Sequence, residues 1–153
     1  MSDIDINQLI QDTYSAKLQD QNVGGITNQL RLSKIPIFIR GDNEYLLMAI
    51  NHLWDNALRH STQGDTIIIH TEVQDNSAII KITDTGVGIA EDDLDRIFER
   101  FYRLDKAGST RGFGLGLPIA KAVVESLDGN ITVESELGKG TTFQIKLPLS
   151  EDH

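Results

Sequence analysis

Two apolar runs separated by three polar residues restrict the fold more than any other part of this 153-residue chain. TIIIHTEV at 66–73 and SAIIKIT at 77–83 are rich in β-branched residues, and QDN at 74–76 is a typical turn sequence. This pattern predicts a β-hairpin. Its second strand leads directly into the sequence DTGVGI, so Asp84 is predicted to lie at a strand end.

The spacing of apolar residues predicts three helices and one shorter helix. The first helix covers about 5–19, with Asp3 or Asp5 as its cap, and the second runs from a cap at Asp42 to about residue 60. A third helix is predicted over 117–128, because proline suits its first turn and glycine follows its last. Apolar residues around 97–101 predict the short helix.

Further strands are predicted on either side of these helices. Residues 26–40 alternate loosely and fit two strands, with Pro36 marking an edge strand. NITVES at 130–135 and TTFQIKLPL at 141–149 form a final hairpin that turns through ELGKG. Mixed helices and strands of this kind predict an α+β fold, a two-layer α/β sandwich.

Composition and charge argue against several kinds of binding partner and metal site. A chain of this length is expected to form one domain, and its net charge of −9 opposes broad contact with nucleic acid or anionic membranes. The absence of cysteine excludes disulfides and thiolate metal sites and favours a reducing cytosol. No apolar run approaches the roughly 20 residues of a membrane span, and the amino terminus lacks the plan of a signal peptide.

GFGLGL at 112–117 leads directly into the third predicted helix. Its glycine spacing does not match a dinucleotide fingerprint, and GKGTT at 138–142 lacks the Ser or Thr that a P-loop requires after its lysine. A flexible glycine stretch before a helix offers unpaired N–H groups to a phosphate, but it also suits a plain hinge. The polar stretch RLDKAGSTRG at 103–112 has no periodicity and is predicted to be mobile, with poor order over about 105–114 in the absence of nucleotide.

Three polar residues elsewhere in the chain favour phosphate binding over a plain hinge. Asn56 on the second helix can place an amide oxygen on a divalent ion, and Arg59 one turn on can place a cation on phosphates. Asp84, before Gly86 and Gly88, can accept a hydrogen bond from an exocyclic amine. Taken singly, Asn56 is better explained as an exposed or capping amide, and Asp84 as a turn residue.

The order of these motifs resembles one family. LWDNALRHS, DTGVGI, IFERFYR, GFGLGL and GKGTTF are similar to the asparagine box, first glycine box, phenylalanine box, second glycine box and terminal hairpin of the ATP-binding catalytic domain of sensor histidine kinases. The resemblance covers nearly the whole chain. It implies the Bergerat fold, a mixed and mostly antiparallel five-stranded sheet packed on three helices, with ATP between the asparagine-box helix and a movable lid.

The resemblance also implies roles for individual residues. Asn56 would hold Mg²⁺, and Arg59 and His60 would approach the phosphates or the sugar. Asp84 would receive the adenine amino group, supported by Thr141 through water, and Arg103 would meet the γ-phosphate, so that Asn56 and Arg103 are the predicted catalytic pair. Lys106 and Arg111 are looser lid candidates. The remaining predicted nucleotide-binding residues, which form the backbone beside the base, the apolar walls and the lid hinge, are Gly86, Gly88, Ile89, Gly112, Gly114, Leu115, Gly116 and Leu117.

The chain departs from the family at His52, where an asparagine usually precedes the metal-binding asparagine by four residues. His52 could contact a phosphate or a metal-bound water, or it could be an inward-facing structural histidine. ATPases that share the fold, such as gyrase and mismatch-repair proteins, resemble one another in carrying glutamate there to activate water. His52 therefore argues against hydrolysis.

The second departure is the absence of a phosphate acceptor. None of the four histidines lies in the H-E-x-x-[TN]-P setting of an acceptor helix. We therefore expect residues 1–153 to be the carboxy-terminal catalytic fragment of a larger sensor kinase, a monomeric and cytoplasmic transferase of two-component signal transduction. Its partners would be ATP or ADP, a separate dimerisation and phosphoacceptor domain, and a downstream response regulator. The full sensor could be membrane-anchored, although this fragment is expected to make no membrane contact.

Two alternatives remain open. One is a stand-alone ATPase or serine kinase of the same superfamily, which the missing glutamate disfavours. The other is a degenerate module that binds a nucleotide or a partner without catalysis, which the presence of Asn56, Asp84 and the glycines disfavours.

Overall fold

The computed structural model of the chain describes residues 1–20, 25–99 and 116–151. Its main sheet contains β2 (Thr27–Arg31), β4 (Thr66–Gln74), β5 (Ser77–Asp84), β7 (Gly140–Pro148) and β6 (Asn130–Glu136), in that spatial order. Only the β2–β4 pair is parallel among these strands. The predicted mixed, mostly antiparallel five-stranded sheet is confirmed.

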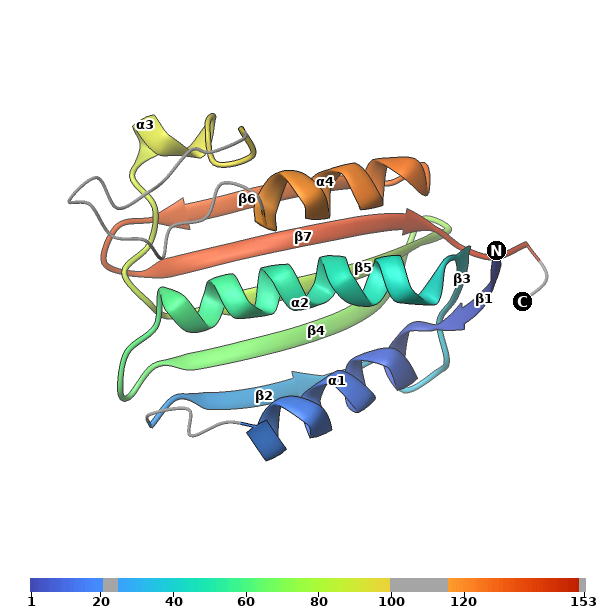
Figure 1. The fold of residues 1–153 in the computed structure, drawn as a ribbon, viewed down its shortest axis with the longest axis horizontal. Coiled ribbons are helices and arrows are strands. Elements are labelled where there is room, and N and C mark those ends of the chain that lie inside the picture. The colour runs from blue at the N-terminus through green and yellow to red at the C-terminus, as the bar shows by residue number, and fades with distance from the viewer. Residues whose placement is uncertain (21–24, 100–115, 152–153) are drawn as a thin grey trace.

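Three long helices cover one face of this sheet (Figure 1). They are α1 (Ile6–Asp20), α2 (Asn43–Arg59) and α4 (Gly116–Ser126). Asp42 caps α2 as predicted, because its carboxylate accepts the backbone N–H groups of Glu44 and Tyr45 at 2.9 and 3.3 Å. The two-layer α/β sandwich is confirmed, with one further helix, the short α3 (Glu91–Leu94).

The short helix was predicted in the wrong place. Residues 95–98 form turns, and α3 begins earlier, where three acidic residues occupy the first turn and complement the helix dipole. The aromatic ring of Phe98 packs edge-on against Phe143 at 6.1 Å between centroids, and the Lys121 ammonium lies 5.6 Å from its centroid. Contacts with distant residues, rather than helical periodicity, therefore explain the apolar residues at 97–98.

Both predicted hairpins are confirmed. β4 and β5 pair in register from Ile67 opposite Asp84 to Gln74 opposite Ser77. Asp75 and Asn76 occupy the turn with φ of 53° and 62°, the left-handed values that a two-residue hairpin turn requires and that these residue types tolerate. Asp84 consequently lies at the end of β5.

The core lies between the helices and the sheet. Along α2, residues at helical spacing are fully or almost fully buried against alternate residues of β4, β5 and β7. Asp84 and Thr141 stand in this same buried face of the sheet, at one end of it. Large buried side chains of this layer include Leu46, Ile50, Leu53, Trp54, Ile67, Ile69 and Phe143.

A two-stranded sheet that the sequence did not predict lies at the opposite end of the molecule from Asp84 (Figure 1). β1 (Ser2–Asp5) pairs antiparallel with β3 (Phe38–Gly41), although Asp5 also caps α1 as expected, accepting the N–H of Gln8 at 3.1 Å. Ser150 ties both strands to the end of the chain: its N–H donates to the Phe38 carbonyl and its hydroxyl donates to Asp3, both at 2.8 Å. The prediction that Pro36 marks an edge strand was wrong, because Pro36 lies in the loop between β2 and β3.

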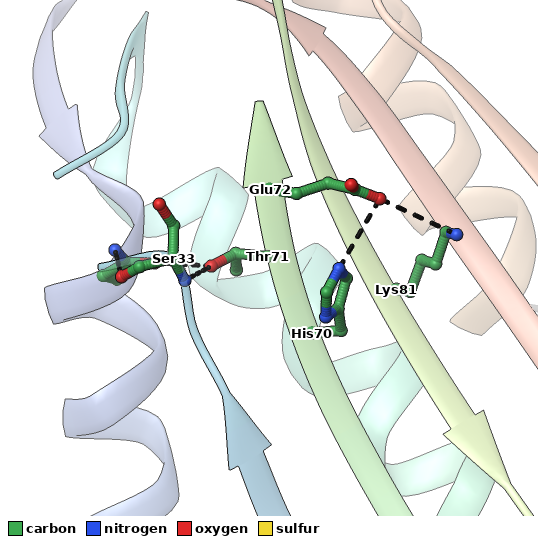
Figure 2. Close-up of polar contacts among 6 residues, drawn as sticks. Ser33, His70, Thr71, Glu72 and Lys81 are labelled. Atoms are coloured by element: carbon green, nitrogen blue, oxygen red, sulfur yellow. Dashed lines mark hydrogen bonds and ion pairs between the residues drawn. The ribbon is translucent and has the colours of Figure 1, made fainter. Parts of the chain in front are cut away.

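The two faces of the main sheet differ in character, as β4 shows (Figure 2). On the helix side, the buried hydroxyl of Thr71 accepts the N–H of Ser33 at 2.8 Å and donates to Asn7 of α1 at 2.7 Å, which fixes the loop after β2. On the other face, His70 and Lys81 flank Glu72 at 3.5 and 3.8 Å. The helix-free face therefore carries partly exposed charged residues.

Polar and aromatic contacts join α1 to α2. The Lys17 ammonium lies 2.6 Å from the Asp55 carboxylate and 5.6 Å from the centroid of the Trp54 ring, which also stacks with Tyr14. The indole N–H of Trp54 donates to the Asn28 side chain at 3.0 Å. Among the described residues, no helix is both long enough and apolar enough to cross a bilayer.

Candidate functional site

Three polar residues form one row across neighbouring strands at the end of the sheet where β5 terminates. Asp84 of β5 stands directly opposite Thr141 of β7, and Thr141 stands directly opposite Ser135 of β6. Asp84 and Thr141 are only 3% and 4% exposed. Burying polar groups has a free-energy cost, so this row at a strand end is a candidate for a binding site.

The carboxylate of Asp84 has an unusual electrostatic environment. Burial disfavours its charged form and, with the nearby charge of Asp65, raises its pKa from 3.8 to about 6, although hydrogen bonds from the backbone of Gly86 and Thr141 oppose the shift. The Gly86 N–H donates to the Oδ1 atom at 2.9 Å. Ionised at neutral pH, Asp84 is therefore a desolvated hydrogen-bond acceptor.

The loop that follows Asp84, residues 85–89, is held on both sides by the chain itself. The N–H of Val87 donates to the carbonyl of His60 at 3.2 Å, and the carbonyl of Val87 accepts the N–H of Gly138 at 2.9 Å. The N–H of Ile89 donates to the Ser135 hydroxyl at 2.7 Å. These contacts connect the end of α2, the 85–89 loop and the β6–β7 turn.

The same contacts explain why two residues of the loop are glycines. A Cβ added to Gly86 would lie 2.0 Å from the carbonyl oxygen of His60, and one added to Gly88 would lie 2.2 Å from that of Glu136. Gly88 also has a φ of 77°, which side-chain-bearing residues rarely adopt. The packing of the protein's own backbone therefore requires these glycines, independently of their predicted place beside a base.

The carboxyl end of α2 lies at the same end of the sheet as Asp84 (Figure 1). Asn56 and His60 are half-buried there, and Arg59 is exposed as the last residue of the helix. Burial, followed by the charge of Arg59, lowers the pKa of His60. His60 also closes the helix, since its N–H donates to the carbonyl of Asn56 at 3.2 Å.

His52 lies one helical turn before Asn56 and is partly exposed, not enclosed in the core. Burial is the main cause that lowers its pKa, and Arg59 acts in the same direction, whereas the nearby Asp55 carboxylate raises it. His52 is therefore neutral at physiological pH, with a ring nitrogen able to accept a hydrogen bond.

The two residues predicted as apolar walls are buried. Ile89 ends the 85–89 loop and Leu117 lies in the first turn of α4, and they are 3% and 5% exposed. α4 begins at Gly116, one residue before the start that the sequence predicted. The other lid and hinge predictions lie outside the described residues: Arg103, Lys106, Arg111, Gly112, Gly114, Leu115 and the predicted mobility of 105–114.

Sequence reasoning missed Ser135 and the backbone role of His60. A serine in a strand is unremarkable by itself, and its contacts with residues 46 positions earlier and 5–6 positions later exist only after folding. Its position opposite Thr141 in the predicted final hairpin was the available signal.

The described arrangement suits a flat, amine-bearing ligand with an anionic tail. Asp84 offers a buried acceptor, Ile89 and Leu117 are buried apolar residues, and Asn56, Arg59 and His60 lie at the end of α2. Amide oxygen is a suitable ligand for a hard divalent ion such as Mg²⁺, which commonly completes its shell with phosphates and water. Within the described residues, no group of three or more acidic, histidine or cysteine side chains gathers as a metal cage.

Comparison with known proteins agrees with this description. Residues 41–151 match the family described as histidine kinase-, DNA gyrase B- and HSP90-like ATPase. The sensor histidine kinase RppB of Synechocystis is 37% identical over 146 residues, which are 94% of this chain and 32% of RppB. The sensor protein SrrB of Staphylococcus aureus is 45% identical over 112 residues, 72% of this chain and 19% of SrrB.

A solved structure extends the similarity to three dimensions. The mycobacterial sensor histidine kinase MprB superposes with a TM-score of 0.85 at 29% identity, covering 97% of this chain and 98% of that chain. The curated relatives are much longer than the chain, which spans only 32% of RppB and 19% of SrrB.

Proposed function

The chain belongs to the histidine kinase-, DNA gyrase B- and HSP90-like ATPase family, as a histidine kinase catalytic and ATP-binding domain, and we propose that it binds Mg-ATP and donates the γ-phosphate to a histidine of a separate domain. Family membership implies ATP binding. The roles of individual residues and the partner of the reaction are the parts that we propose.

One observation carries the nucleotide assignment: a buried, hydrogen-bonded carboxylate stands at a strand end. Asp84 accepts the Gly86 N–H with one oxygen, which leaves capacity to accept the exocyclic amine of adenine. A guanine base presents a carbonyl oxygen at that position and would meet a like acceptor. Asp84 therefore favours adenine, with Ile89 and Leu117 against the faces of the base, Gly86 and Gly88 beside it, and Thr141 in support.

The phosphates are assigned to the end of α2 and the glycine-rich segment. Asn56 would hold Mg²⁺ through its amide oxygen, with the nucleotide supplying further oxygen ligands. Arg59 and His60 lie within one turn of Asn56 and would approach the phosphates or the sugar. Gly112, Gly114, Leu115 and Gly116 would enclose the phosphates, and Arg103 would stabilise charge on the transferring γ-phosphate.

The proposed acceptor histidine belongs to another domain. Of the histidines, His70 lies on the helix-free face of the sheet beside Glu72 and Lys81 (Figure 2), whereas the site lies on the helix side. The much greater length of the sensor kinase relatives supports a separate phosphoacceptor domain. We propose that residues 1–153 act as the catalytic domain of a larger sensor of this kind, monomeric when isolated, with a response regulator downstream.

A stand-alone ATPase or serine kinase of the same family is the less favoured function. Its support is the family description, which includes ATPases. His52 disfavours it, because a half-buried neutral imidazole does not replace the carboxylate that activates water in hydrolytic members of the fold. The two sensor proteins among the relatives disfavour it as well.

Calorimetric titration with a non-hydrolysable ATP analogue, with and without Mg²⁺, tests the site. Asn56→Ala and Asp84→Ala should each weaken binding by roughly ten- to a hundredfold, since each removes a hydrogen bond or ligand to a charged group. Asn51→Ala, an asparagine on the same helix, is the matched control and should bind like the parent. Parent affinity in both site variants would contradict the assignment.

Radiolabel from γ-labelled ATP tests the reaction. The isolated chain should not accumulate phosphohistidine, whereas a separately produced phosphoacceptor domain of the same sensor should become labelled slowly, because docking is then bimolecular. The label should be lost with Asn56→Ala. Stable label on the 153-residue chain alone, or rapid phosphate release that Asn56→Ala abolishes, would favour the alternative function.

A further inference from the structure

The hydroxyl of Ser135 has three partners at the end of the polar row. It lies 2.7 Å from the Ile89 nitrogen, 2.8 Å from the Gly140 carbonyl oxygen and 2.8 Å from the Thr141 hydroxyl. All three distances are typical of well-formed hydrogen bonds. Ser135 therefore joins the 85–89 loop to Gly140 and Thr141 at the start of β7, the strand that faces Asp84.

Counting protons fixes the direction of these bonds. A serine hydroxyl has one proton to donate and two lone pairs to accept. Its contact with the Gly140 carbonyl consumes the proton, because a carbonyl can only accept, and the Ile89 N–H takes one lone pair. The Thr141 hydroxyl must then be the donor in its contact with Ser135.

Because of the strand order, the hydrogen bond that Thr141 donates to Ser135 affects Asp84. β7 lies between β5 and β6, so Thr141 has Asp84 on one side and Ser135 on the other. A Thr141 proton that is donated to Ser135 is not donated to Asp84. The carboxylate thus keeps its capacity to accept a hydrogen bond from a ligand.

The Ile89 contact gives Ser135 a second effect. The 85–89 loop is bound at its start by Asp84, through the Gly86 N–H, and at its end by Ser135. Between them, the backbone of Val87 bonds to backbone atoms of His60 and Gly138, and Thr85 bonds to Thr66 and Asp65. Ser135 is therefore the side chain that fixes the position of Ile89, a wall of the site.

We propose that Ser135 is a positioning residue of the adenine site, which holds Ile89 in place and turns the Thr141 hydroxyl away from Asp84. This inference rests on the proposed nucleotide-binding function and assigns Ser135 no contact with the nucleotide. It accounts for a side chain that connects two elements of the site and lies in neither of them.

Titration of ATP into Ser135→Ala tests the first effect. We expect about tenfold weaker binding, because a hydrogen bond that fixes Ile89 is lost. Ser135→Thr keeps the hydroxyl on a residue suited to a strand and should bind within about twofold of the parent. Thr132→Ala, an exposed position on the same strand, controls for general weakening of β6 and should also bind like the parent.

The pH profile of ATP affinity tests the second effect. In Ser135→Ala, the Thr141 hydroxyl becomes free to donate to Asp84, which stabilises the carboxylate, so the decline in affinity on acidification should move to lower pH than in the parent. The titratable group Asp65, which also acts on Asp84, is unchanged. Adding Thr141→Val to Ser135→Ala removes the competing donor and should return the decline toward that of the parent.

Several outcomes would overturn the inference. Parent affinity in Ser135→Ala, or a loss that Ser135→Thr does not restore, would show that the hydroxyl does not position the site. An unchanged pH profile in Ser135→Ala would refute the orientation of Thr141. If Ser135→Ala does not fold, Ser135→Cys, whose thiol is a weak hydrogen-bonding group, carries the same expectations. A parent chain that binds no ATP would refute the proposed function itself, which is a distinct result.

Discussion

Replacing Asp84 by asparagine should stabilise the ligand-free protein at neutral pH while weakening nucleotide binding. The pKa of Asp84 is raised from 3.8 to about 6 in the folded chain, mainly by burial. A folded-state pKa above the unfolded value means that the folded protein holds the Asp84 proton more tightly. The contribution of this proton to the free energy of unfolding is fully present below about pH 4 and is lost as pH rises through about 6. At about 1.4 kcal/mol per pKa unit, the ionised carboxylate costs the folded state about 3 kcal/mol.

Asparagine removes this cost because it carries no charge and its oxygen can still accept the Gly86 N–H. Its NH₂ group requires a partner of its own, which offsets part of the gain. We therefore expect Asp84→Asn to be more stable than the parent by roughly 1 to 3 kcal/mol at pH 8, and to differ little at pH 4.

Urea unfolding of both proteins at pH 4, 6 and 8 measures this difference. Asp75→Asn is the matched control, because Asp75 is an exposed residue of a hairpin turn with a φ of 53°, which asparagine also tolerates. The control should follow the parent at every pH. A stability difference between Asp84→Asn and the parent that stays constant from pH 4 to 8 would refute the argument that burial of the charge causes the shift.

Three further predictions follow from the described contacts. ATP affinity should decline below about pH 6, approaching tenfold per pH unit, because protonated Asp84 has lost a lone pair to its proton, and a flat titration profile would contradict this. Gly88→Ala should destabilise the fold by more than about 3 kcal/mol, whereas Gly138→Ala, with a φ of 82° but open space around it, should cost about 1 kcal/mol; equal unfolding midpoints would refute the packing argument. Lys17→Met should lower the free energy of unfolding by about 1 kcal/mol, because the ion pair with Asp55 is lost. High salt weakens that pair in the parent, so the difference between parent and variant should become smaller.

Elements built from neighbouring residues could be predicted from the sequence. The 66–84 hairpin follows from two alternating runs and a turn whose Asp75 and Asn76 adopt left-handed φ. α2 follows from its cap at Asp42 and an apolar face at helical spacing. Because Asp84 ends one of these elements and Asn56 lies in the other, the main polar residues of the site could be named in advance, although their binding roles remain predictions.

Features that depend on distant partners could not be predicted. β1 exists because β3 pairs with it, about 35 residues further along the chain, and its own four residues carry little strand signal. The side chain of Phe98 indicated a helix, but Phe143 and Lys121 hold it in a turn. Similarly, glycine at 86 and 88 suggested room for a ligand, whereas the atoms that fill that room are carbonyl oxygens of His60 and Glu136.

The hydrogen bond between Ser150 and Asp3 holds the two ends of the described chain together, far from the site. Both ends of the described chain lie at one end of the sheet, and Asp84 lies at the other, where β5 ends (Figure 1). β4 has nine residues, so at about 3.3 Å per residue the site is roughly 30 Å from that end. A swing of about 10° around an attachment there would carry Asp84 about 5 Å, which exceeds the length of a hydrogen bond. In the larger sensor that we propose, a small rotation at that end would therefore suffice to bring a bound ligand into or out of reach of a group in another domain.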